Sequence, residues 1–107
     1  MLVGIHQPHY LPWLRYFEKI DACDVFVVLD TVQFTKNGWQ NRNKIKSAAG
    51  ELLLTVPVHA KSSSRIVDVA VDNTQQWQRR HVRAIEQNYS AAPHFNSIMD
   101  QLREYYA

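Results

Sequence analysis

The sequence predicts an α/β fold, in which an N-terminal strand–helix–strand (βαβ) unit with a small, mostly parallel sheet is followed by two C-terminal helices. Three observations lead to this prediction. An apolar run ends at His6, a continuous β-branched run spans residues 25–29, and residues with helical spacing lie between them. Two further segments with helical periodicity fill the last third of the chain. A helical pattern between two strand patterns is typical of a parallel pair.

The first element is a strand that ends at His6. Pro8 and Pro12 exclude both a continued central strand and a helix interior. Beyond Pro12 the apolar residues share one face of a helix, namely Trp13, Leu14, Phe17 and Ile20. We therefore expect strand, polar turn and helix, with the turn at the carboxyl end of the strand, where open α/β sheets bind ligands.

The second strand is predicted at Val25–Leu29, and Asp30 follows it directly. A continuous apolar run of this kind indicates a strand buried on both faces. Residues 31–46 are then expected to form an ordered loop with at most one helical turn, because Asn37-Gly38 marks a turn and amides dominate the segment.

The rest of the chain is predicted to contain two strands and two helices. Residues 51–58 form a strand in which Pro57 indicates an edge position or a bend, and residues 66–71 alternate as a further strand. Asp72 or Asn73 caps a helix that runs to about Tyr89, with residues 79–83 as its solvated face. The last helix opens at residues 90–93. The inward residues are expected to be Trp77, Ala84, Ile85, Tyr89, Phe95, Ile98, Met99 and Leu102.

Size and composition exclude several classes of protein. With 107 residues the chain forms at most one domain, residues 1–107. A net charge of +2 is too small to argue for a nucleic-acid partner. The single cysteine, Cys23, excludes an internal disulfide and fits a reducing compartment. No apolar run approaches the roughly 20 residues of a membrane span, and no secretory signal is present. We expect a cytoplasmic protein, and association into a homo-oligomer stays open.

The polar turn carries the first candidate site residues, His6, Gln7 and His9. As zinc ligands the two imidazoles lack a third partner at a recognisable spacing, so no metal site is predicted. Imidazole and amide groups beside a helix N-terminus can bind phosphate or carboxylate. The imidazole of His6 could serve as a general acid or base. The alternative is a turn in which His6 only caps backbone groups.

The segment that follows the second strand combines aromatic, cationic and amide side chains. Arg42 suits bidentate contact with phosphate or carboxylate, and Lys36 and Lys44 supply point charges. A solvated loop is the alternative. Asp30 could orient a sugar hydroxyl, an amine or Mg²⁺, or act as a cap. The candidate substrate-binding residues here are Gln33, Lys36, Trp39, Asn41, Arg42, Asn43 and Lys44.

Several linked motifs in one order resemble the WbqC-like protein family. They are Ile5–Trp13, Tyr16–Ile20, Asp24–Asp30, Val32–Phe34, Trp39–Lys46 and Leu54–Val58. The resemblance implies that residues 1–107 are a single WbqC-like domain and the N-terminal half of the full family domain. It further implies a glycine (aminoacyl) transferase that acylates a nucleotide-activated amino sugar of a bacterial O-antigen or surface polysaccharide. The partners would be the nucleotide sugar and an activated glycine donor.

On this resemblance His6 and Asp30 are the candidate catalytic residues, and Arg42 and Lys44 would hold phosphate. The cofactor is unspecified, with ATP and Mg²⁺ as one candidate. His6-Gln-Pro-His9 is also similar to the His-x-Gly-His motif of adenylyl- and cytidylyltransferases, with Pro8 in place of the glycine. This second resemblance implies a nucleotidyltransferase- or Rossmann-like sheet. The alternatives are therefore a nucleotidyltransferase-like enzyme and a non-catalytic module that binds sugar nucleotides.

Overall fold

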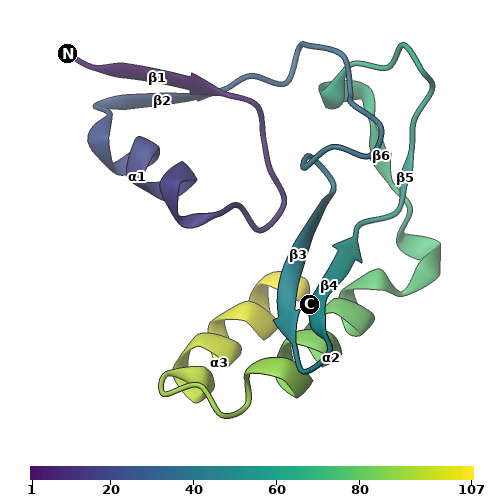
Figure 1. The fold of residues 1–107 in the computed structure, drawn as a ribbon. Coiled ribbons are helices and arrows are strands. Elements are labelled where there is room, and N and C mark those ends of the chain that lie inside the picture. The colour runs from purple at the N-terminus through teal and green to yellow at the C-terminus, as the bar shows by residue number, and fades with distance from the viewer.

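The computed structural model describes residues 1–107 and has the predicted α/β architecture, with an N-terminal βαβ unit and two C-terminal helices (Figure 1). The elements in order are β1 (Val3–His6), α1 (Leu14–Ala22), β2 (Val25–Val28), β3 (Arg42–Ser47), β4 (Gly50–Thr55), β5 (Val58–His59), the 3-10 turn η1 (Ile66–Asp68), β6 (Ala70–Val71), the 3-10 turn η2 (Asn73–Gln75), α2 (Trp77–Tyr89) and α3 (Phe95–Tyr106).

The βαβ unit is built on a two-stranded parallel sheet. Val3 lies opposite Val25, and His6 lies opposite Val28. Gly4 is required where β1 passes the end of α1, because a Cβ at this position would collide with Cys23 Sγ. The strands of this unit are therefore parallel, as predicted, and they lie close to the end of the helix that joins them.

Only one face of this sheet is covered. Figure 1 shows α1 on one side of β1 and β2 and no element on the other. Val3, Ile5, Val25 and Val27 share the open face and are between 41% and 54% exposed. The prediction that the second strand is buried on both faces was wrong, because the chain supplies a helix for one face only.

The apolar residues that share one face of α1 are not the ones that the helix buries. Trp13, Leu14 and Phe17 are exposed, whereas Tyr16 is buried against the sheet. The Tyr16 ring lies 5.7 Å from that of Phe26 on β2. Because the helix contacts the sheet through this bulky ring, its stripe of Trp13, Leu14 and Phe17 is turned away from the strands.

The third and fourth strands form an antiparallel hairpin in which Arg42 pairs with Thr55 and Ser47 with Gly50. Gly50 has a φ of 113°, which a glycine adopts without strain. The expectation of a loop up to residue 46 was therefore wrong. A polar strand forms here because β4 supplies the backbone partners and Ile45 packs on the core. Pro57 stands at a bend, as predicted, since β4 ends at Thr55.

The predicted strand over residues 66–71 was wrong for most of its length. Ile66–Asp68 is a 3-10 turn, and only Ala70 and Val71 pair, with the two residues of β5. Arg65 Nε donates to Asp68 Oδ2 at 3.0 Å, a spacing of three residues that suits a helical turn rather than a strand. Asp72 caps η2 through the Thr74 N–H, and α2 begins only after Gln76.

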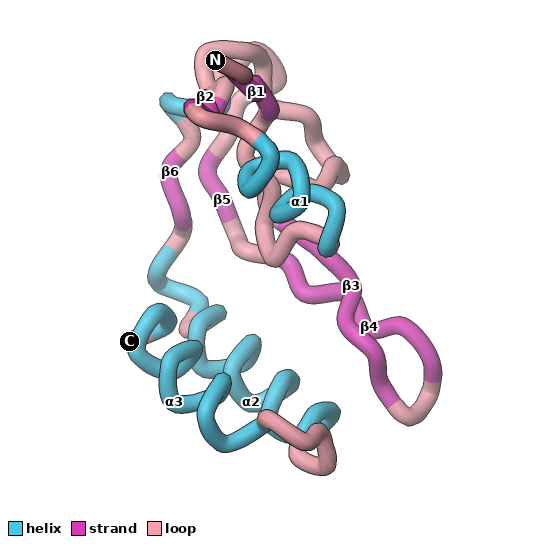
Figure 2. The backbone as a smooth tube through the Cα atoms, turned by 90° about the vertical axis from the view of Figure 1, so that its left-hand side faces the viewer, coloured by secondary structure: helices cyan, strands magenta, loops and turns pink.

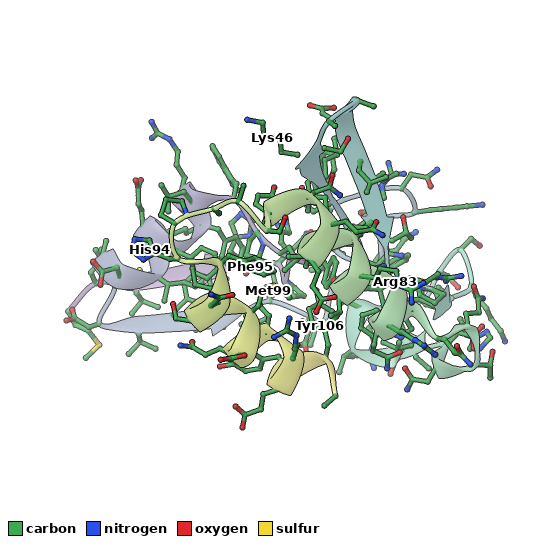
Figure 3. The ribbon with its side chains drawn as sticks, turned by 90° about the horizontal axis from the view of Figure 1, so that it is seen from below. Lys46, Arg83, His94, Phe95, Met99 and Tyr106 are labelled. Carbon is green, nitrogen blue, oxygen red and sulfur yellow. The ribbon has the colours of Figure 1, made fainter.

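The main core lies between the hairpin and the two C-terminal helices. Leu54, Ile85 and Met99 are buried there, and Met99 points inward from α3 (Figure 3). Ile98 was predicted to face inward but is 52% exposed, because the inward stripe of α3 follows Met99. Residues 79–83 were predicted to be solvated, yet His81 is buried. Figure 2 shows the βαβ unit and the helices at opposite ends of the molecule.

Candidate functional site

Hydrogen bonds join the polar turn to the amide-rich segment. Gln40 Nε2 donates to Gln7 Oε1 at 2.7 Å, and the Tyr10 N–H donates to the Trp39 carbonyl at 3.0 Å. Asn43 Nδ2 donates to the carbonyls of Tyr10 and Leu11 at 3.2 Å and 2.8 Å. The two stretches that the sequence singled out are therefore neighbours in space.

The turn holds a strained backbone at Leu11. Its φ is 42°, in the left-handed region that a residue with a side chain rarely adopts, and the following Pro12 further restricts it. The Asn43 amide fixes the Leu11 carbonyl. Such strain persists only where surrounding contacts enforce it, and it gathers at functional sites.

The two imidazoles of the turn lie against each other. The His6 and His9 rings are 4.8 Å apart in an edge-on arrangement, and Tyr16 contacts both. His6 Nδ1 is 2.9 Å from the Gln7 carbonyl, which can only accept, so Nδ1 carries the hydrogen and Nε2 keeps its lone pair. Burial and the neighbouring His6 lower the pKa of His9, which favours its neutral form. In the neutral His6 ring, Nε2 is thus the nitrogen that can accept a proton.

A cavity of about 800 Å³ opens beside the amide-rich segment. Its volume is that of a small-molecule site. It contains the cations Lys36, Arg42 and Lys61 and no carboxylate, so it favours an anion. Its lining residues are Gln33, Phe34, Thr35, Lys36, Asn37, Asn41, Arg42, Thr55, Val56, Pro57, Val58, Ala60, Lys61 and Ser62.

Arg42 is the most constrained cation in this cavity. Its Nη2 donates to the Asn37 carbonyl, and its guanidinium carbon is 5.9 Å from the Trp39 ring centroid. Its Nε is buried and has no hydrogen-bond partner. A buried donor without a partner costs about 1–3 kcal/mol. A ligand oxygen at this nitrogen would remove that cost.

The predicted site residues fall into two neighbouring groups. Gln33, Lys36, Asn41 and Arg42 line the cavity, and Trp39 lies beside Arg42. The turn group is His6, Gln7 and His9, none of which belongs to the cavity wall. Three more predicted residues, Asn43, Lys44 and Asp30, belong to neither group.

Asn43 binds the turn rather than the cavity. Lys44 forms an ion pair with Glu51 at 2.8 Å on the hairpin. Asp30 follows β2, and its carbonyl accepts from the Val67 N–H at 2.9 Å. The structure thus separates the guanidinium of Arg42, in the cavity wall, from the imidazoles of the turn.

Sequence reasoning missed a buried polar cluster that connects the turn to both helices. Tyr10 Oη is 2.6 Å from His81 Nδ1 and also contacts Tyr106 Oη. His81 Nε2 is 3.0 Å from the Thr55 carbonyl, so Nε2 carries the hydrogen and Nδ1 accepts from Tyr10. Burial lowers the pKa of His81 and raises that of Tyr10. The four-residue spacing of Trp77, His81 and Ile85 is the signal that could have revealed it.

No three His, Cys, Asp or Glu side chains gather where they could hold a metal ion. None of the helices combines the length and the apolar character that crossing a bilayer requires.

Comparisons with known proteins identify relatives of the sequence. The sequence model of the WbqC-like protein family matches residues 7–107. The chain is 43% identical over 106 residues to an uncharacterized protein of Mycobacterium tuberculosis, a match that covers 97% of this chain and 46% of the relative. This chain therefore spans about half the length of that relative. No solved structure matches significantly.

Proposed function

Since this chain belongs to the WbqC-like protein family, we propose that it is a glycine (aminoacyl) transferase acting on a nucleotide-activated amino sugar in the synthesis of a bacterial O-antigen or surface polysaccharide. The buried, unpartnered Arg42 Nε in a cationic cavity is the observation that carries the proposal. The resemblance supplies the identity of the acyl group and of the polysaccharide.

In this proposal the cavity binds the phosphates and the sugar. Arg42 offers a fork of donors that fits a phosphate, and Lys36 and Lys61 add charge without a carboxylate to neutralise them. Gln33 and Asn41 each donate through their amide nitrogen to a protein carbonyl. Their amide oxygens are then left to accept hydrogen bonds from sugar hydroxyls.

The turn would supply the acid–base chemistry. The sugar nitrogen attacks the activated glycyl carbonyl, a C–N bond forms, and the activating group leaves. His6 Nε2 takes the proton that the nitrogen loses. Asp30 orients the amine in this scheme. The hydrogen bonds between Gln7 and Gln40 and between Asn43 and the turn would fix the imidazole relative to the phosphate-binding group.

Ligand binding is tested by thermal shift with UDP-glucosamine as the probe. At a concentration of about 100 times Kd, a specific ligand stabilises a protein by about 2.7 kcal/mol. Arg42→Lys keeps the charge but removes the Nε donor and the fork, so we expect at least about a tenfold loss of affinity, or about 1.4 kcal/mol. Lys46→Ala is the matched control, because Lys46 lies on the same strand and outside the cavity wall. Equal shifts in the two variants would contradict the proposed phosphate contact.

Turnover is tested by incubating the protein with labelled glycine, ATP, Mg²⁺ and the amino sugar nucleotide. We expect His6→Ala to bind the nucleotide sugar normally and to lose glycyl transfer. Binding without turnover in any condition would instead identify a non-catalytic sugar-nucleotide module. Pyrophosphate release from a nucleoside triphosphate and a sugar phosphate, without glycine, would identify a nucleotidyltransferase-like enzyme.

A further inference from the structure

The open face of the β1–β2 sheet is a continuous apolar surface. Register places Val3 beside Val25 and Ile5 beside Val27, so four side chains form two adjacent pairs on one face. Each is at least 41% exposed. Isolated exposed apolar residues are ordinary on a protein surface, but a contiguous group of them marks an interaction site. Parallel sheets in particular are normally covered on both faces.

No further strand pairs with the edges of the same sheet. β1 pairs only with β2, and β2 only with β1, so each strand has one edge without a neighbour. Trp13, Leu14 and Phe17 add exposed apolar surface on α1. A partner that fits this unit therefore has to cover both the open sheet face and the apolar stripe of α1, which point in different directions. The same partner can add a strand to either edge of the sheet.

We propose that this face, formed by Val3, Ile5, Val25 and Val27, is a docking surface for a polypeptide equivalent to the part of the Mycobacterium tuberculosis relative that lies outside the match. The match covers only 46% of that relative, so more than half of its chain is available to cover this face. This assigns residues 1–107 the role of one half of the family domain.

A second copy of this chain fits the surface less well. Two copies meeting through the open faces would bury only four partly exposed aliphatic side chains each. A stable interface buries about 800 Å² per partner. Such a dimer would also leave the α1 stripe uncovered, whereas a longer polypeptide can reach both surfaces.

The first experiment co-expresses this chain with the unmatched part of the relative as a separate, tagged polypeptide. We expect a one-to-one complex on size-exclusion chromatography, and we expect Ile5→Lys to abolish it. Ile98→Lys is the matched control, since Ile98 is 52% exposed against 54% for Ile5 and lies on α3. A complex that survives Ile5→Lys, or self-association of this chain through the same face, would overturn the proposal.

The second experiment does not require the unmatched part of the relative to fold as a separate polypeptide. A single-chain chimera replaces the matched part of the relative with residues 1–107. Ile5→Lys should lower the Tm of the chimera by several degrees and leave the Tm of residues 1–107 alone unchanged. Ile98→Lys should change neither. An unchanged Tm in the Ile5→Lys chimera would show that the face stays open and would refute the docking role.

Discussion

Two parts of the molecule bury their apolar residues to different extents. One is the βαβ unit of β1, α1 and β2, and the other is the hairpin–helix unit of β3, β4, α2 and α3. In the hairpin–helix unit, Leu54, Ile85 and Met99 form a core enclosed by a sheet on one side and two helices on the other. In the βαβ unit Tyr16 is the one large residue that is buried, while Ile5 and Phe17 stay exposed. Both units nevertheless contain regular strands and helices. The comparison teaches that strands and helices can form without an enclosed core, whereas burial of apolar side chains needs a second layer.

The difference has consequences for stability. Burying apolar surface contributes roughly 25 cal/mol per Å², so the unit with the enclosed core contributes most of the stability of the chain. Mutations in the βαβ unit should act through close backbone packing rather than through loss of a large core.

The largest effect is expected at Met99, which is 1% exposed. Met99→Ala leaves a cavity between α3 and the hairpin and should cost about 2–5 kcal/mol. Ile98→Ala, one position earlier on the exposed side of α3, should change stability by less than about 0.5 kcal/mol. Urea denaturation followed by circular dichroism measures both. A small loss for Met99→Ala would mean that the hairpin–helix core is not the main source of stability.

A smaller effect is expected at Gly4 in the βαβ unit. An alanine Cβ would collide with Cys23 Sγ, so Gly4→Ala should cost about 1–3 kcal/mol through overpacking. Replacing Cys23 with alanine removes the sulfur, and the double variant Gly4→Ala/Cys23→Ala should recover much of the loss. If Gly4→Ala were neutral on its own, β1 would not be held against the end of α1.

The contact between the two units is tested at Tyr10. Tyr10→Phe leaves His81 Nδ1 without its donor and Tyr106 without its partner, which should cost about 1–2 kcal/mol. Tyr105→Phe is the control, because Tyr105 is 86% exposed. A double-mutant cycle of Tyr10→Phe and Tyr106→Phe measures their coupling. Additive losses would show that the two hydroxyls do not act together.

Much of the fold could be predicted because it depends on local pattern. The strand that ends at His6, the strand that begins at Val25 and both C-terminal helices follow from apolar periodicity and Pro8. β3 could not be predicted, because its residues are mostly polar and it forms a strand only by pairing with β4. The face that α1 turns to the sheet also could not be predicted, because a single contact between Tyr16 and Phe26 decides it.

The candidate site was predictable in part for the same reason. Residue chemistry was enough to nominate Arg42 and Lys36, and the structure places both at one cavity. Lys61 joins them only through the folding of β5, which no local pattern reveals. His81 follows two arginines in the sequence, which favours an exposed position. Its burial depends on Tyr10 and Thr55, which are distant along the chain. Their roles in a reaction stay predictions.

The smallest expected effect is on the pH dependence of stability, and it compares His81 of the hairpin–helix unit with His9 of the polar turn. Burial lowers the pKa of His81, and burial together with His6 lowers that of His9. On acidification the unfolded chain therefore takes up these protons first, near the ordinary pKa of about 6.5. The folded state thus loses stability as pH falls below this value, by at most about 1.4 kcal/mol per pH unit for each histidine.

The measurement is the Tm of the wild type and two variants between about pH 7.5 and about pH 5.5, a range that spans the ordinary histidine pKa. His81→Gln removes the titrating group in the enclosed unit and should flatten the pH dependence most, because His81 is 4% exposed whereas His9 is only partly buried. His9→Gln should remove a smaller part. If His9→Gln flattened the curve more than His81→Gln, the polar turn would be the more tightly packed site. The distinction between an enclosed hairpin–helix unit and an open βαβ unit would then fail at the polar turn, where the two units meet.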